Sequence, residues 1–245
     1  MSRRKVRIFY LPLNRDVILG FVGLVILLSF GFIHFDKSNN INEQAVFSQQ
    51  NKPIYNGPED KQAMALTINV AWGEEFLPSM LDTLDKYNVK ATFFFVGRWV
   101  EKFPDKTKEI QKRGHELGNH GFRHLHPKQL DKERLIKLIK DNEELINKTT
   151  GYKTDLFAPP YGEVDDRVAQ VAAEIGYKTI MWSADTIDWQ RPAPDVIINR
   201  VIDKASNGGI VLMHPTKPTA EALPQIIERL QSEGYKLVTV SELLE

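Results

Sequence analysis

The histidines of this chain are concentrated in one short stretch. Four of the six lie between residues 115 and 126, at His115, His120, His124 and His126. His120 and His124 are four residues apart, and on one turn of a helix this spacing places two imidazoles on the same face, close enough to bind one metal ion. Such a pair also occurs as plain surface or packing residues, so the prediction of a metal site depends on the rest of the chain.

Other polar residues directly follow apolar runs. In chain order these strand-end positions are Asn69, His120, residues 159–162 (PPYG), Asp185 with Asp188 and Trp189, and His214. Taken singly, Asp185 and Asp188 could cap the next helix, and His214 could be a hydrogen-bonded core histidine. Taken together at one edge of a sheet, they predict a metal-assisted hydrolytic site.

The elements that must bring these residues together begin near residue 62. Apolar runs predict strands at 63–70, 89–96, 153–158, 177–183, 209–214 and 236–240, with a short segment at 115–120. Amphipathic patterns predict helices at 76–87, 100–113, 132–147, 165–175, 195–205 and 220–232. This alternation predicts an α/β fold with a parallel sheet, a distorted (β/α)7-type barrel whose site lies at the carboxyl ends of the strands. A doubly wound open sheet is the alternative, although no GxGxxG follows the first strand.

The N-terminal region predicts a membrane anchor. Residues 1–16 are basic, and residues 17–35 are almost wholly apolar, long enough for a transmembrane helix. A buried core helix rarely lacks polar residues over such a length, and the end of the run offers no small-x-small signal-peptide cleavage site. The preceding positive charges predict a single-pass protein of the cell membrane, with a cytoplasmic N-terminus and residues 62–245 on the outer face. The polar residues 36–61 predict a flexible linker.

Composition excludes several classes of function. Lys+Arg and Asp+Glu both number 32, so no global charge attracts nucleic acid. The chain has no cysteine, which excludes disulfides, thiolate metal sites and a cysteine nucleophile.

Residues 62–245 resemble the polysaccharide deacetylase family, the NodB-homology domain of carbohydrate esterase family four. The resemblance rests on His120 and His124 for an HxxxH motif, on Leu212-Met213-His214, on Asp185, Asp188 and Trp189 for D-x-x-D-W, and on the PPYG stretch. It implies a barrel that removes acetyl groups from N-acetylated cell-wall glycan, such as peptidoglycan or chitin-like oligomers. It also implies one divalent metal, usually zinc, held by one Asp and two His.

The resemblance assigns roles to individual residues. His120 and His124 are the expected metal ligands, and His214 is the expected general acid. Asp185 is expected to orient His214, and the backbone amide of Tyr161 to bind an oxyanion. Trp182, Trp189 and Pro160 are expected to contact substrate, although plain core packing explains the tryptophans almost as well.

Three positions depart from the family pattern. Asn69 stands at the base position, Val70 stands where the metal-binding Asp is expected, and Ala158 replaces an Arg that pairs with the base. An amide cannot take a proton from water at neutral pH, so Asn69 can orient a water molecule but cannot activate it. The loss of the base Asp at Asn69 and the loss of the Arg at Ala158 are consistent with each other, because a buried Arg without its carboxylate partner would destabilise the fold. The Trp72-Gly73 pair closes this first motif, and in this respect the sequence resembles a branch of the family that includes sporulation-associated membrane proteins.

Two functional readings follow. The first is a membrane-anchored deacetylase with low activity, in which Asp185 or Asp188 serves as a weaker base, or Glu74 or Glu75 reaches the metal. The second is a catalytically impaired glycan-binding or scaffolding protein on the outer face of the membrane.

Overall fold

The computed structural model describes residues 52–245. The predicted basic N-terminus (1–16), the predicted transmembrane helix (17–35) and all of the predicted linker up to residue 51 lie outside these residues. Within the described part of the chain, no helix is long and apolar enough to cross a membrane.

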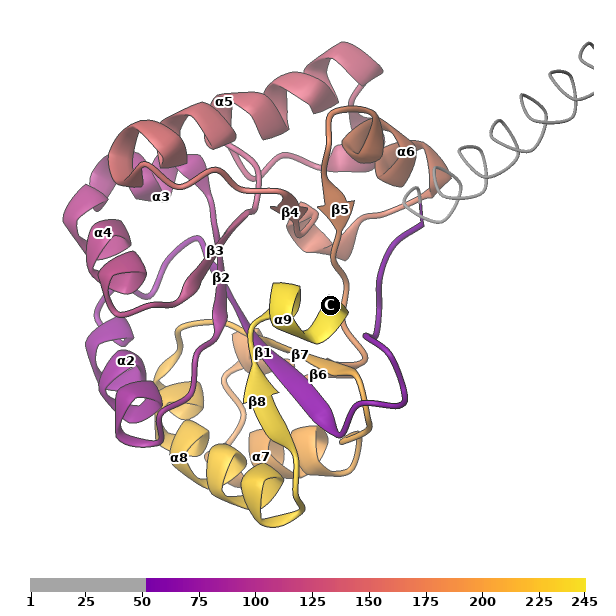
Figure 1. The fold of residues 1–245 in the computed structure, drawn as a ribbon. Coiled ribbons are helices and arrows are strands. Elements are labelled where there is room, and N and C mark those ends of the chain that lie inside the picture. The colour runs from indigo at the N-terminus through magenta and orange to yellow at the C-terminus, as the bar shows by residue number, and fades with distance from the viewer. Residues whose placement is uncertain (1–51) are drawn as a thin grey trace, which may run out of the picture. The chain divides into compact units, whose positions relative to one another are not determined.

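The described residues fold into an α/β domain around one parallel sheet (Figure 1). The strands are β1 (Ala63–Val70), β2 (Thr92–Phe95), β3 (Glu116–Asn119), β4 (Leu156–Phe157), β5 (Lys178–Thr179), β6 (Ala184–Asp185), β7 (Gly209–Met213) and β8 (Lys236–Val238). Seven run in the order β5-β4-β3-β2-β1-β7-β6, and β8 pairs with β1. This curled parallel sheet fits the predicted (β/α)-type barrel, and the central β1 is buried along its whole length.

The edge strands β5 and β6 are not paired with each other; instead, the chain that precedes β1 lies beside this gap. Ile54 forms a parallel bridge with Ile180, just after β5, and Asn56 forms an antiparallel bridge with Gly209 on β7. The Ile54 amide donates to Thr179, and its carbonyl accepts from Met181. The first described residues therefore complete the sheet on its open side.

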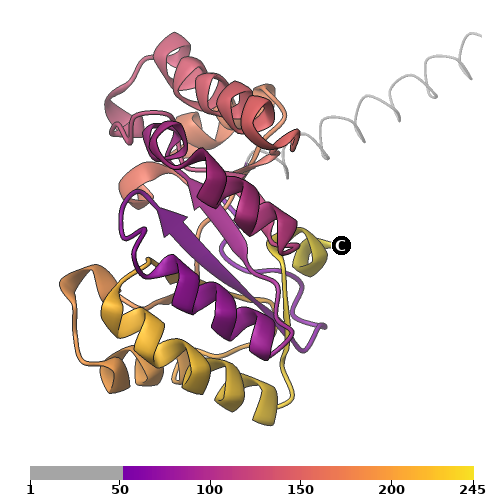
Figure 2. The same cartoon turned by 90° about the vertical axis from the view of Figure 1, so that its left-hand side faces the viewer.

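Helices α2 to α8 cover the outer face of the sheet, while the last helix, α9, does not (Figures 1 and 2). The helices of the described residues are α2 (Leu77–Lys86), α3 (Gly97–Lys102), α4 (Pro104–Lys112), α5 (Lys132–Thr150), α6 (Asp166–Glu174), α7 (Pro194–Ile202), α8 (Lys217–Ser232) and α9 (Val240–Leu244), with short 3-10 turns at Pro127–Gln129, Pro160–Gly162 and Asp188–Gln190. The predicted helix at 100–113 is two helices, because Pro104 begins α4 directly after Phe103.

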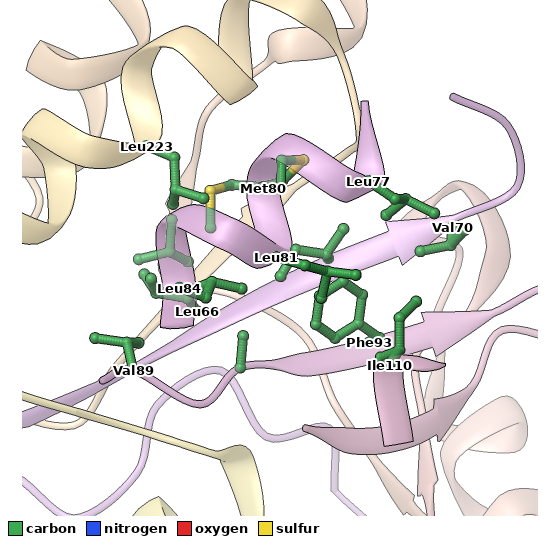
Figure 3. Close-up of a cluster of buried hydrophobic side chains, with 14 of the residues drawn as sticks. Leu66, Val70, Leu77, Met80, Leu81, Leu84, Val89, Phe93, Ile110 and Leu223 are labelled. Carbon is green, nitrogen blue, oxygen red and sulfur yellow. The ribbon is translucent and has the colours of Figure 1, made fainter. Parts of the chain in front are cut away.

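Two apolar layers lie on opposite faces of the sheet. The outer layer packs α2 on β1 and β2, and Figure 3 shows Val70 in it with Leu77, Leu81 and Phe93. The inner layer lies inside the curl and includes Phe94, Ala158 and Leu243. Helix α9 lies at the amino-terminal end of the strands, where the Val240 amide donates to the Thr92 hydroxyl. The candidate site lies at the other end of the sheet, at the carboxyl ends of the strands.

Candidate active site

A cavity of about 470 Å³ lies at the carboxyl ends of the strands. Its lining residues are Asn69, Ala71, Trp72, His120, His124, Tyr161, Gly162, Trp182, Asp185, Trp189, Leu212 and His214. Most of the site residues predicted from the sequence line this cavity, whereas Pro160, Asp188, Val70 and the two glutamates Glu74 and Glu75 do not. The strand-end rule therefore located one real concavity.

The two predicted metal ligands meet in this cavity. Nε2 of His124 lies 3.2 Å from Nε2 of His120. Two nitrogens that each bind zinc at about 2.0–2.1 Å in tetrahedral geometry are roughly 3.3 Å apart. Nδ1 of His120 donates to the Ala158 carbonyl at 2.6 Å, which leaves Nε2 without a proton for a metal ion. The separation of the two rings therefore suits one shared ion.

Burial keeps both imidazoles neutral, which metal binding requires. Desolvation, with smaller contributions from His124 and His214, lowers the pKa of His120 to about 3. Burial also lowers the pKa of His124, together with the neighbouring His214 and His126. At neutral pH both imidazoles are therefore uncharged and can bind a metal ion without first releasing a proton.

A loop, and not a helical turn, brings the pair together. His120 directly follows β3, while Gly121 and His124 have positive φ of 75° and 51° that reverse the chain. The Asn119 side chain supports this loop: its amide nitrogen donates to Ile139, and its oxygen accepts from the Gly121 amide and from Asn142. The i, i+4 spacing thus predicted that the two rings lie close together, but a loop and not a helical turn places them there. Their role as metal ligands stays a prediction.

The donor set beyond these imidazoles only partly fits a zinc ion. Within residues 52–245, no three His, Cys, Asp or Glu side chains are grouped closely enough to hold a metal ion. The oxygen of Asn69 is buried in the cavity wall and has no hydrogen-bond partner in the described part of the chain. Two imidazoles and one neutral amide oxygen are therefore available, and the carboxylate expected from the family is missing.

Val70 is not the cavity-facing position in this fold. Strand pleating directs Asn69 and Ala71 toward the cavity, while Val70 is fully buried in the outer layer under α2 (Figure 3). The expectation that Val70 occupies the place of the metal-binding Asp is therefore corrected, because its side chain points away from His120 and His124.

A buried carboxylate holds His214, and it belongs to Asp188. Oδ1 of Asp188 accepts from Nδ1 of His214 at 2.8 Å, and Oδ2 accepts from the His214 amide at 2.6 Å and from the Thr219 hydroxyl at 2.6 Å. Asp188 is 0% exposed. These bonds leave Nε2 of His214 free to act as the predicted acid.

Asp185, to which sequence reasoning assigned this role, makes a different contact. Its Oδ1 accepts from the Ile187 amide at 2.8 Å, in a turn where Ile187 has a φ of 50°. It lines the cavity and is the only carboxylate among the lining residues. Asp188, the other candidate for a weaker base, already accepts three hydrogen bonds and does not line the cavity, so it is not free for that role.

Position 69, where the family has its base, holds an amide side chain that cannot act as one. Asn69 is 5% exposed, and Ala158, where the family has Arg, is buried in the inner layer. Glu74 and Glu75, the other carboxylates considered from the sequence, are not among the residues lining the cavity. The structure therefore shows His214 hydrogen-bonded to Asp188 and an amide, not a carboxylate, at position 69.

Aromatic rings surround the cavity mouth. Tyr161 is 57% exposed and Trp189 is 56% exposed, while Trp182 is only partly exposed and packs against Gly162. The Tyr161 ring lies between His124, with ring centres 4.4 Å apart, and His126, at 4.0 Å. The backbone of Tyr161 is left-handed, with φ of 60°, and the oxyanion role of its amide stays a prediction.

Sequence reasoning gave no role to Trp72, which also lines the mouth. Its ring stacks on His214 with ring centres 5.8 Å apart and an angle of 8°. An aromatic residue immediately after the buried strand β1 was the available signal, but position alone does not show which neighbour its ring will contact.

Comparison with known proteins agrees with this site. The sequence profile described as polysaccharide deacetylase matches residues 56–180. The YlxY protein of Bacillus subtilis is 46% identical over 198 residues, which cover 81% of this chain and 62% of the relative. A peptidoglycan-N-acetylglucosamine deacetylase of Bacillus cereus is 34% identical over 196 residues, which cover 78% of this chain and 71% of the relative.

A solved structure is also similar: BA3943 of Bacillus anthracis, described as a CE4 family pseudoenzyme. It is 44% identical with a TM-score of 0.78, over 80% of this chain and 69% of that one. A BA3943 mutant described as having restored enzymatic activity has the same TM-score, 0.78, over 80% of this chain and 72% of that one, at 42% identity. The family match and the cavity motifs together show that this chain belongs to the polysaccharide deacetylase family.

Proposed function

We propose that this polysaccharide deacetylase-like protein binds N-acetylated cell-wall glycan and removes its acetyl groups only slowly. The observation that carries the proposal is Asn69, an amide at the base position of an otherwise recognisable cavity. General-base catalysis typically contributes about 10²- to 10⁴-fold to a rate, and an amide cannot supply it. Peptidoglycan and chitin-like oligomers are the proposed ligands, by analogy with the deacetylase relatives.

The acid half supports residual hydrolysis of the C–N bond. Nε2 of His214 is free to donate a proton to the departing sugar amine, while Asp188 holds the ring through Nδ1. Asp185 is the remaining carboxylate in the cavity wall that could accept a proton from water.

His120 and His124 would hold the divalent metal ion, and zinc suits their nitrogen ligands. When bound, such an ion polarises a carbonyl and lowers the pKa of water. Three neutral donors leave its charge uncompensated, so we propose weakened affinity compared with a site that includes a carboxylate.

We propose that residues 17–35 anchor the protein in the cell membrane as a single pass. The apolar run and the basic residues before it support this orientation, with the N-terminus cytoplasmic and the domain on the outer face. The linker of residues 36–61 would then hold the domain near cell-wall glycan. A role in sporulation rests on resemblance to one family branch.

A second candidate is a glycan-binding or scaffolding protein without hydrolysis. The missing base, the missing Arg at Ala158 and the similarity to a pseudoenzyme favour it. The two candidates share the ligand and differ only in turnover.

The experiment compares amine release from an N-acetylglucosamine oligomer by wild type and by Asn69→Asp combined with Ala158→Arg. We expect a rise of about 10²-fold or more, because a carboxylate base and its partner are introduced. Asn69→Ala is the matched control, since it alters the same position without adding a base. If the wild type already equals the Bacillus cereus deacetylase and the double variant is slower, the impaired-base proposal is wrong. Binding without any amine release by the wild type would select the second candidate.

A further inference from the structure

Helix α5 carries one polar side chain in the stripe that it buries. This stripe, spaced at helical intervals, consists of Leu135, Leu138, Ile139, Asn142 and Ile146. Asn142 is 0% exposed, and an amide placed among apolar side chains costs free energy unless it is hydrogen-bonded. A leucine at this position would complete the apolar stripe. The packing of α5 therefore does not explain Asn142.

The side-chain NH₂ of Asn142 bridges two oxygens that hold the loop after β3. It donates to the Phe95 carbonyl at 2.8 Å and to Oδ1 of Asn119 at 2.8 Å. The Phe95 carbonyl also accepts from the His120 amide at 2.9 Å, and Oδ1 of Asn119 also accepts from the Gly121 amide at 2.9 Å. One buried amide group therefore fixes both acceptors of the first two loop residues.

The protein would remain hydrogen-bonded without this bridge. Each acceptor keeps its backbone donor from the loop when Asn142 is removed, so no buried oxygen is left unpaired by the loss. Asn142 in fact adds one: within residues 52–245, its own side-chain oxygen is buried and has no hydrogen-bond partner. A buried acceptor without a donor destabilises a fold. The benefit of Asn142 therefore lies in the loop that it holds.

This loop needs support because its backbone is strained. Gly121 and His124 have positive φ of 75° and 51°, a region that is unfavourable for a residue other than glycine. The resulting turn brings Nε2 of His124 to 3.2 Å from Nε2 of His120. A loop that was free to relax would lose this approach of the two imidazoles.

We propose that Asn142 is a positioning residue for the metal site, which sets His120 and His124 in their binding geometry before an ion arrives. The inference rests on the proposed metal binding by these two histidines and deepens it. Asn142 does not line the cavity, so it acts through Asn119 and Phe95 and not through a contact with the ion. Residues that orient metal ligands in this way typically contribute about 10- to 100-fold to metal affinity.

The experiment titrates the full chain, purified in detergent, with Co²⁺ and follows the visible absorption of the ion, which reports both affinity and ligand geometry. We expect Asn142→Leu to weaken Co²⁺ binding about tenfold or more and to change the absorption spectrum, because the two imidazoles are no longer held together. Without metal, hydrogen–deuterium exchange should become faster in residues 119–124. Asn142→Ala, which cannot overlap a neighbour, should do the same, so the result does not depend on how a leucine fits.

Thr92→Val is the matched control, because it removes a buried polar group at the opposite end of the sheet. The Thr92 hydroxyl donates to Glu116 and accepts from the Val240 amide. We expect Thr92→Val to lower stability while leaving Co²⁺ affinity, spectrum and loop exchange unchanged. Wild-type affinity in both Asn142 variants, or an equal loss with Thr92→Val, would overturn the inference while leaving the metal site intact. If the wild type binds no Co²⁺, the metal site of the proposed function fails as well.

Discussion

Replacing Asp188 with Asn tests which carboxylate supports the acid histidine. Asp188 accepts hydrogen bonds from the His214 imidazole, the His214 amide and the Thr219 hydroxyl, all in a fully buried position. An Asn has one acceptor oxygen, and its other atom is an NH₂ donor. The Thr219 hydroxyl can reverse to accept from that NH₂, but the His214 amide cannot.

The expected cost follows from this count. A buried backbone N–H left without an acceptor costs about 1–3 kcal/mol, and a neutral acceptor in place of a charged one weakens the imidazole bond by ~1 kcal/mol. We therefore expect Asp188→Asn to lower the free energy of unfolding by about 3 kcal/mol. For a domain of this size, that corresponds to a fall in Tm of roughly 6–12 °C.

Asp185→Asn is the matched control, because it lies three residues away and also faces the site. Its Oδ1 accepts only from the Ile187 amide, and an Asn oxygen can accept the same bond. We expect a change within about 0.5 kcal/mol in urea unfolding followed by circular dichroism. If Asp185→Asn costs as much as Asp188→Asn, or if Asp188→Asn costs nothing measurable, the assignment of Asp188 as the partner of His214 is refuted.

Three further predictions concern stability and metal binding. Burial, reinforced by Lys90, lowers the pKa of His115 to about 4 from 6.5, so the unfolded chain binds the extra proton between these values and stability falls as pH drops through this window. His115→Gln should remove up to ~3 kcal/mol of that acid sensitivity in urea titrations at pH 7 and pH 4.5. Ala71→Asp should tighten zinc binding at least tenfold in a competition assay, because position 71 lines the cavity. Val70→Asp should not tighten zinc binding and should lower the free energy of unfolding by several kcal/mol, because it buries an unpaired charge under α2. Gly73→Ala should cost at least ~2 kcal/mol because its Cβ would meet a backbone oxygen.

Each of these has a contradicting result. Unchanged acid sensitivity in His115→Gln would mean that other groups govern the acid transition. Tighter zinc binding by Val70→Asp than by Ala71→Asp would show that the strand end is not pleated as described. Gly151→Ala, also at positive φ but with no atom within 4 Å of a Cβ, should cost less than Gly73→Ala, and the reverse order would contradict the packing argument.

The strand-end residues were predictable because a parallel sheet has one rule. Apolar runs locate the strands, and the first polar residue after each run lies at the same edge. This rule brought Asn69, His120 and His214 to one cavity without any knowledge of side-chain contacts. It also placed the site at the correct end of the strands, although β4, β5 and β6 have only two residues each.

The partner of His214 was not predictable in the same way. Asp185 and Asp188 are three residues apart, and both follow the same apolar run. The choice between them is made by a turn in which Ile187 takes a φ of 50°, which an isoleucine rarely adopts. The residue types do not predict that turn. The orientation of Val70 was missed for a related reason, since matching motifs by position ignores the alternation of side chains along β1.

The two halves of the site carry different weight as evidence for function. Asp188 ties the strand end of β7 to the start of α8, so the fold needs this carboxylate whether or not His214 donates a proton. His124 is different. Its φ of 51° costs about 1–2 kcal/mol for a residue other than glycine, and its only hydrogen-bond partner within the described residues is Nε2 of His120. Two nitrogens of neutral imidazoles at 3.2 Å gain at most one hydrogen bond, whereas one cation between them would satisfy both. The hydrogen bonds between His214 and Asp188 are explained by stability alone, but the strained backbone of His124 is not. A metal ion bound by His124 and His120 would account for that strain.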